Sequence, residues 1–166
     1  RRDQSQRARV RALGGMQKEA LVTSSVSGTT WRLVSDEGEY LDGDDVAPCP
    51  LAFLTTGMVS SYMNEVLALA EERDIDLRDV TLVQDNYYTM QGSALAGTMT
   101  AGALPVDLTA RIDADADEAA LRDLVETATR CSPVNGLMAG ERNSLFKLAL
   151  DGEAIPTDRV AELDGP

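Results

Sequence analysis

Apolar and polar side chains alternate along four stretches of the chain, a pattern typical of strands with one buried face. The stretches are residues 18–25, 30–36, 79–88 and 104–112. The Ser-Gly-Thr sequence between the first two suits a hairpin turn. A shorter apolar stretch, residues 144–152, predicts one further strand near the end of the chain.

Helical spacing replaces this alternation over about residues 51–73, where apolar side chains recur every three or four positions. Pro50 suits the start of this helix because the first turn leaves its N–H groups unpaired in any case. An acidic run predicts a second helix over residues 117–131, and Ser132-Pro133 then begins a short helix over residues 134–140. Because strands and helices are grouped rather than alternating, the pattern predicts an α+β fold and not a doubly wound one.

The charge balance narrows the range of partners. The 166 residues hold 15 Lys and Arg against 28 Asp and Glu, a net charge of −13. That balance argues against nucleic acid, since phosphate contacts need clustered basic side chains. Five arginines nevertheless fall within residues 1–11, and we interpret residues 1–16 as a flexible basic tail ahead of a single domain over residues 17–166.

The most apolar stretch, residues 51–70, carries too many polar side chains for a membrane span. We therefore expect no membrane association and a cytoplasmic location with reduced thiols. The sequence contains no histidine, which excludes catalytic arrangements and metal sites that depend on imidazole. Two cysteines are too few for a four-thiolate zinc site, so we expect neither a metal site nor a cofactor.

Two motifs resemble a known family. Residues 31–77 read as a strand, a Ser-Asp-Glu turn, a Gly-Asp loop, a proline and a long helix, and residues 128–138 (ATRCSPVNGLM) contain a helix break before Pro-Val. This order is similar to that of the OsmC/Ohr family, the osmotically inducible protein C and organic hydroperoxide resistance proteins. The resemblance covers about residues 17–152. It implies an intertwined homodimer in which curved sheets wrap long central helices, with two sites at the subunit interface.

The resemblance also implies a redox chemistry that this chain lacks at the matching positions. Family peroxidases use a reactive cysteine on the long helix and a second cysteine before Pro-Val, which together form a disulfide. Alignment on Gly57 puts Val59 at the first position, and Ser132 occupies the second. Cys49 and Cys131 lie nearby in sequence, either as inert thiols or as a relocated redox pair.

The remaining candidates surround these positions. Tyr62 is expected on the same helix face and could donate a proton, Arg32 lies on a strand that approaches the site in the family, and the methionines could line an apolar pocket. Each of these residues also has a purely structural alternative: Tyr62 as a half-buried aromatic, Arg32 as a solvated or ion-paired side chain, and the methionines as ordinary core residues. The candidate catalytic residues are Tyr62, Cys131, Cys49, Ser132 and Arg32. The candidate substrate-binding residues are Thr56, Met58, Val59, Met63, Asp85, Tyr87 and Asn135.

Three hypotheses about function follow. The first is a divergent member that binds or transforms a small apolar organic molecule in a dimer-interface pocket without thiol redox cycling, for example as a cofactor-independent lyase, isomerase or hydrolase. The second is a thiol-dependent organic hydroperoxide reductase that uses Cys49 and Cys131. The third is a binding or scaffold protein without enzymatic activity.

Overall fold

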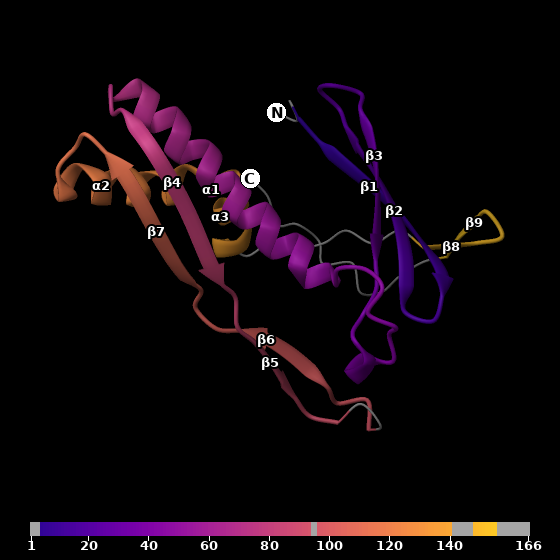
Figure 1. Ribbon diagram of the computed structural model, residues 1–166. Helices are drawn as coiled ribbons and strands as arrows, with labels where there is room; N and C mark the ends of the chain where they lie inside the picture. The colour runs from indigo at the N-terminus through magenta and orange to yellow at the C-terminus, as the bar shows by residue number, and fades with distance from the viewer. Residues whose placement is uncertain (1–3, 94–95, 141–147, 156–166) are drawn as a thin grey trace.

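The computed structural model describes residues 4–93, 96–140 and 148–155, which form three α-helices and four antiparallel sheets (Figure 1). The strands are β1 (Gln6–Gly14), β2 (Gln17–Ser24), β3 (Thr30–Ser35), β4 (Leu77–Asp85), β5 (Tyr88–Gln91), β6 (Thr100–Ala103), β7 (Asp107–Ala114), β8 (Leu148–Leu150) and β9 (Glu153–Ile155). The helices are α1 (Pro50–Glu72), α2 (Glu118–Cys131) and α3 (Pro133–Ala139), with a 3₁₀ turn at Glu39–Leu41. The fold is therefore the α+β architecture that the sequence predicts.

Strands β1, β2 and β3 form an antiparallel sheet in that order. The structure differs here from the flexible basic tail expected over residues 1–16, because residues 6–14 form β1 and pair with β2 along its length. The physical reason is the alternation of Arg with Ala and Val in this segment, which places all arginines on one face of a strand. The hairpin between β2 and β3 agrees with the predicted turn.

Helix α1 leads away from this sheet and carries the core on its second half (Figure 1). Val66 and Ala70 of α1 pack against Leu124 and Ala128 of α2, and all four are almost completely buried. Helix α2 begins where predicted, since the Asp117 side chain accepts a hydrogen bond from the backbone N–H of Ala120 at 2.8 Å.

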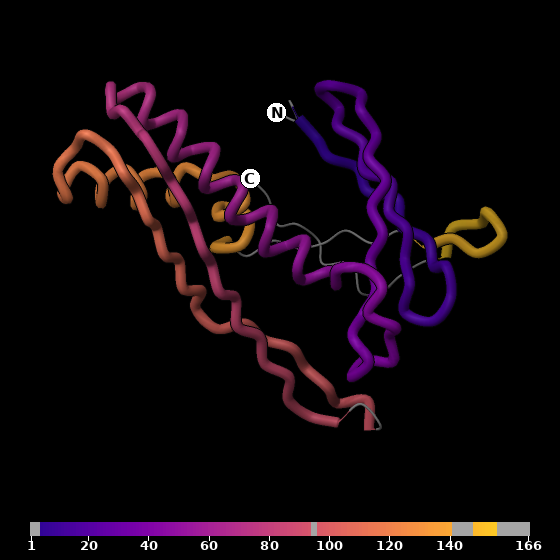
Figure 2. Tube along the Cα trace, viewed as in Figure 1, coloured from indigo at the N-terminus to yellow at the C-terminus, as the bar shows by residue number. Residues whose placement is uncertain are grey.

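Strands β4 and β7 form a two-stranded ribbon beside these helices, and β5 and β6 extend it (Figure 2). Val80 and Leu82 of β4 pack against the core. The sequence predicts a single strand over residues 79–88, but the ladder ends at Asp85 and resumes at Tyr88.

The other differences concern short strands. Neither β6 nor β9 was expected, and the predicted closing strand at 144–152 is represented by β8, residues 144–147 lying outside the described part of the chain. Within the described residues, none of the helices is both long and apolar enough to cross a membrane.

The loop between β3 and α1 is organised by a buried carboxylate. Asp36 is fully buried, and its Oδ2 atom accepts hydrogen bonds from the backbone N–H groups of Asp44 at 3.1 Å and Val46 at 3.3 Å. Gly43 lies so close to Glu37 that a Cβ atom there would be 1.9 Å from the Glu37 carbonyl oxygen. These contacts place Cys49 and Pro50 at the start of α1.

Candidate functional site

A cavity of about 340 Å³ lies between α1, the β4–β5 junction, β6 and α3. Helix α1 contributes Leu54, Met58 and Tyr62 to its lining. The other lining residues are Asn86, Tyr87, Tyr88, Ala103, Leu104, Pro105, Val106, Asn135, Met138 and Ala139. None of these described lining residues has an acidic or basic side chain, although the chain as a whole has a net charge of −13.

Two serine hydroxyls meet beside this cavity. The Oγ atoms of Ser61 on α1 and Ser132 lie 2.8 Å apart, within hydrogen-bond distance. Ser132 ends α2 and caps α3, where its hydroxyl also accepts a hydrogen bond from the backbone N–H of Asn135 at 3.2 Å. It is 1% exposed. Ser61, two residues after Val59, is therefore the residue of the long helix whose side chain contacts Ser132.

Tyr62 follows directly and points its hydroxyl towards α3. The Tyr62 hydroxyl donates to the Asn135 Oδ1 atom at 3.5 Å, a long hydrogen bond. The Tyr62 side chain is 2% exposed, and this burial raises the pKa of its hydroxyl above the ordinary value of 10.0. At neutral pH Tyr62 is consequently protonated and acts as a hydrogen-bond donor.

Side-chain amides form a second polar group next to Met58. The Gln84 Nε2 atom donates to Asn86 Oδ1 at 2.6 Å, and the Asn86 Nδ2 atom donates to the Tyr88 hydroxyl oxygen at 3.2 Å. Both amide nitrogens also lie 3.7 Å from the Met58 sulfur. The Tyr88 hydroxyl is left with its own hydrogen to donate.

The structure brings together Met58, Tyr62, Tyr87 and Asn135 from the predicted site residues, all of them in the cavity lining. Tyr87 contributes its ring, while its hydroxyl donates to Asp107 Oδ2 at 3.1 Å, and this hydrogen bond raises the pKa of Tyr87.

The other predicted residues do not line this cavity. Arg32 is on β3, where it pairs with Glu19 of β2. Thr56 is exposed and its hydroxyl donates to the Ala52 carbonyl oxygen of the preceding turn at 2.8 Å. Val59, Met63 and Asp85 are also absent from the lining.

Neither cysteine side chain is part of the serine pair: Cys49 is distant from it along α1, and Cys131 is exposed to solvent. Cys49 precedes α1, and twelve residues of chain separate it from Ser61, about 18 Å at the rise of an α-helix. Cys131 adjoins Ser132 in sequence, but its side chain is exposed at the end of α2. Both thiols are free. This placement does not support a Cys49–Cys131 disulfide within one chain, because such a bond needs Cα atoms within about 7 Å.

Sequence reasoning missed Ser61, Gln84, Asn86 and Tyr88. Asn86 and Tyr88 lie in the sequence Asp-Asn-Tyr-Tyr, of which only Asp85 and Tyr87 are among the sequence-based candidates, although a strand would place Asn86 and Tyr88 together on its other face. The break between β4 and β5 interrupts that alternation, so the cavity is lined by Asn86, Tyr87 and Tyr88 in succession.

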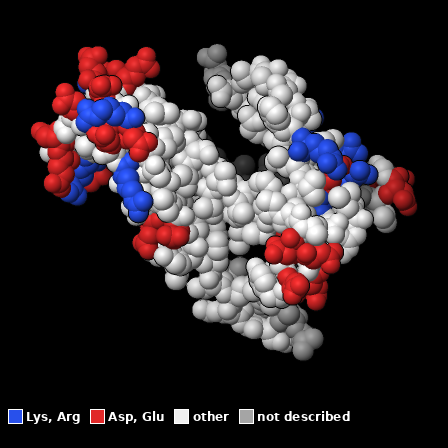
Figure 3. Space-filling model, viewed as in Figure 1, with Lys and Arg blue, Asp and Glu red and all other residues white. Residues whose placement is uncertain are grey.

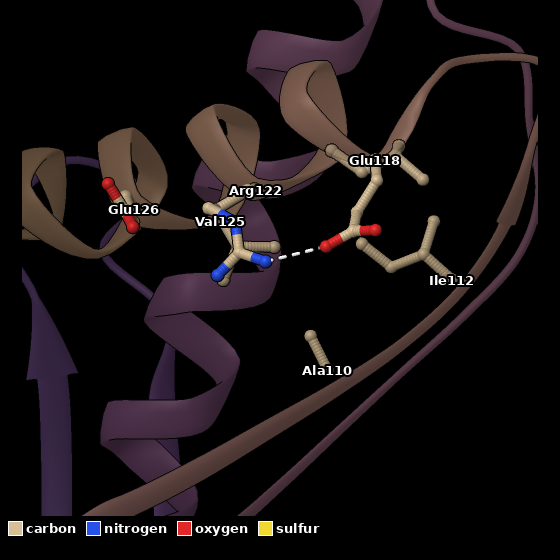
Figure 4. Close-up of a pocket in the computed structure, with 7 residues that line it drawn as sticks. Ala110, Ile112, Glu118, Arg122, Val125 and Glu126 are labelled. Atoms are coloured by element: carbon tan, nitrogen blue, oxygen red, sulfur yellow. Dashed lines mark hydrogen bonds and ion pairs between the residues drawn. The ribbon is translucent and has the colours of Figure 1, made fainter.

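A larger cavity, about 480 Å³, lies between β7 and α2 (Figure 4). Ala110 and Ile112 line it from the strand, and the Glu118–Arg122 ion pair lies at the helix side. Glu118 and Arg122 are exposed and pair with each other, Glu126 also lines the cavity, and the described lining includes none of the predicted site residues. This cavity is therefore the weaker candidate for a functional site.

Comparison with known proteins gives a consistent result. A model of the OsmC-like protein family matches residues 42–144. An OsmC-like hydroperoxide resistance protein from Jannaschia sp. is 19% identical, with a TM-score of 0.60 over 89% of this chain and 94% of that chain. An organic hydroperoxide resistance protein, OsmC, from Legionella pneumophila is 18% identical, with a TM-score of 0.61 over 82% and 90%. An OsmC-like protein from Mycoplasma pneumoniae is 12% identical, with a TM-score of 0.59 over 83% and 88%. No curated protein matches the chain.

Proposed function

The chain belongs to the OsmC-like protein family, and from this premise we propose that it binds a small, mainly apolar organic molecule without thiol redox cycling. The proposed binding site is the cavity between α1, the β4–β5 junction and α3. One observation carries the proposal: the two positions that face each other beside this cavity are the serines 61 and 132, with their hydroxyls 2.8 Å apart.

The serine pair lacks the chemistry of a redox-active cysteine pair. In a family peroxidase, the cysteine of the long helix and the cysteine before Pro-Val must touch in order to form their disulfide. The residues that touch here have hydroxyl oxygens, which do not form a disulfide and are poor nucleophiles without a neighbouring base. Among the residues that the structure describes, the cavity lining offers no carboxylate, lysine or arginine that would serve as such a base.

The lining also supports a particular class of ligand. Apolar side chains dominate the described part of the lining, and none of its side chains is charged, so these residues would not compensate a charged molecule for its lost hydration. The hydroxyl of Tyr62, whose pKa is raised by burial, is a protonated donor beside these apolar walls, and the Tyr88 hydroxyl, which accepts from Asn86, has a hydrogen left to donate. A neutral molecule with one oxygen acceptor, such as an alcohol, a ketone or an epoxide, matches this arrangement. If the ligand is transformed as well as bound, Tyr62 is placed to polarise that oxygen by a hydrogen bond, given in place of its long bond to Asn135.

We further propose that the active form is a homodimer. The register of the first sheet puts Val10, Trp31 and Leu33 on one face, and these side chains are 58%, 65% and 38% exposed. An apolar sheet face of this kind is stabilised by a covering layer. Light scattering should therefore give a mass of twice 17.8 kDa.

Two assays test the proposal. The first follows consumption of cumene hydroperoxide with a dithiol reductant, for the wild type and for the Cys49→Ser/Cys131→Ser variant. We expect neither protein to exceed the background rate. Turnover that disappears in the double variant would overturn the proposal and establish a hydroperoxide reductase that uses relocated thiols.

The second assay measures binding of N-phenyl-1-naphthylamine, a neutral apolar fluorophore, by its emission. Met58→Trp should fill the cavity and abolish the fluorescence gain, whereas Val26→Trp, at a position 68% exposed in the β2–β3 turn, should leave it unchanged. Equal binding by both variants would show that the cavity is not the site. Absence of binding by the wild type would favour the scaffold hypothesis.

A further inference from the structure

The first sheet has a second face that is chemically unlike its apolar one. Residues directly opposite in an antiparallel ladder point to the same face. The register of β1 with β2 and of β2 with β3 therefore gathers four arginines and one glutamate on a single face. Its charged members, here called the arginine face, are Arg7, Arg9, Arg11, Arg32 and Glu19. Figure 3 shows one group of Lys and Arg side chains over this sheet, and others mixed with Asp and Glu at the opposite side of the molecule.

One carboxylate is shared by two of these arginines. Glu19 on β2 accepts from Arg11 at 2.7 Å and from Arg32, and these two hydrogen-bonded arginines lower the pKa of Glu19 below its usual 4.5. Arg7 and Arg9 have no ion-pair partner among the described residues. The arginine face thus has an excess of three positive charges in a chain whose net charge is −13.

The surface between these side chains is hollowed. A depression of about 280 Å³ is lined by Arg9, Arg11, Glu19 and Leu21, so an aliphatic floor lies between cationic walls. The side chains of Arg11 and Arg32 remain 67% and 61% exposed despite their ion pairs. The hollow is therefore accessible from solvent.

The outer edge of β1 is also unpaired within the described part of the chain. The sheet order is β1-β2-β3, so β1 is an edge strand and no described strand pairs with its outer side. An edge of this kind offers a row of unpaired backbone N–H and C=O groups. A second β1 strand is a poor partner, because antiparallel pairing would put arginines opposite arginines.

We propose that the arginine face binds an acidic peptide segment that lies extended along β1, with carboxylates at alternate positions. Arg7, Arg9 and Arg11 repeat every second residue, about 6.7 Å apart, which is the repeat of same-face side chains in any extended strand. A strand added at the β1 edge would pair its backbone there and set its carboxylates opposite these arginines. This interaction is separate from the cavity and does not depend on the ligand proposed for it.

The size of the face favours a short segment over a long polyanion. The distance from Arg7 to Arg11 is about 13 Å, and the three strands span about 10 Å. The chain as a whole has a net charge of −13, so a nucleic acid that extended well past the arginine face would meet a net repulsion.

The test uses rhodamine-labelled peptides and fluorescence anisotropy with the full chain. One heptapeptide alternates Thr and Glu with three Glu, and its control has the same composition with the three Glu in a block. We expect the alternating peptide to bind more tightly. Arg7→Gln/Arg9→Gln should weaken it about tenfold at about 50 mM salt, and Arg7→Lys/Arg9→Lys should retain most of the affinity.

A matched control is Arg111→Gln/Arg130→Gln, which removes two exposed arginines of β7 and α2 and should change the affinity less than about twofold. Three results would overturn the proposal. The block peptide could bind as well as the alternating one, a single-stranded oligonucleotide could displace the peptide at equal concentration, or Arg7→Gln/Arg9→Gln could change the molecular mass. The last would assign the face to contact with a second copy of the chain.

Discussion

Cysteines placed at positions 61 and 132 should form a disulfide that joins α1 to the junction of α2 and α3. The two serine Oγ atoms are 2.8 Å apart. A C–S bond is longer than a C–O bond, so small side-chain rotations bring two sulfurs to the bonded distance of about 2.0 Å. The Ser61→Cys/Ser132→Cys variant is best made in a Cys49→Ser/Cys131→Ser background, which leaves only the new pair of thiols.

The expected stabilisation follows from the size of the closed loop. Positions 61 and 132 are 71 residues apart. In the chain-entropy model a loop of this length lowers the entropy of the unfolded chain enough to stabilise the fold by about 4 kcal/mol. The substitutions also remove the hydrogen bond between Ser61 and Ser132 and the hydrogen bond by which Ser132 caps α3. Each loss lowers the free energy of unfolding by about 1 kcal/mol. Comparing the oxidised and reduced forms of one variant cancels that loss.

The measurement is urea unfolding of the variant with and without reductant, with the disulfide identified by mass spectrometry of its peptides. The control is Val59→Cys/Ser132→Cys, since two residues along a helix turn the side chain by about 200°. We expect only the Ser61 pair to close. A disulfide in the Val59 pair and none in the Ser61 pair would refute the register on which the proposed function rests.

Three further predictions concern stability. Leu124→Ala should lower the free energy of unfolding by about 2–5 kcal/mol in urea titrations, because Leu124 is fully buried in the core, and a loss below about 1 kcal/mol would contradict that packing. Gly43→Ala should lower the melting temperature, since its Cβ would collide with the Glu37 carbonyl oxygen, whereas Gly57→Ala meets nothing within 4 Å and should raise it; equal effects would be unexpected. Burial opposes the ionisation of Asp36, but backbone N–H groups outweigh it and lower its pKa below 3.8. The ionised carboxylate thus stabilises the fold above that value, and the contribution is lost as the pH falls through the lowered pKa. Asp36→Asn should therefore flatten the decline in urea midpoint between about pH 5 and pH 2, and an unchanged slope would count against this role.

Elements with strong local signals were predicted closely. Helix α1 was expected over residues 51–73 and runs from Pro50 to Glu72, because a proline start and apolar spacing define it. Helix α2 ends at Cys131 as expected, since the Ser132-Pro133 break stops it. The pairing of β2 with β3 follows from alternation on both sides of a short turn.

Strands without a large apolar face escaped prediction. In β1 the apolar positions are Ala8, Val10 and Ala12, and the arginines between them resemble those of a charged tail. Strand β6 reads Thr-Ala-Gly-Ala and has almost no side-chain pattern. Such strands form because a neighbouring strand supplies the backbone hydrogen-bonding partners. Their own residues therefore do not predict them, since the stabilising partner lies elsewhere in the chain.

The site depends on the same distinction between local and distant information. Ser132 was recognised because a serine before a proline is a local motif, and the structure confirms that it caps α3. The partner on α1 was placed at Val59 by counting from Gly57, although Ser60, Ser61 and Tyr62 follow within one turn. Which of them faces Ser132 depends on how α2 and α3 pack against α1, and a difference of two residues reverses the helix face. The identity of the hydroxyl pair, and with it the argument against thiol chemistry, therefore comes from the tertiary contact of Ser61 with Ser132.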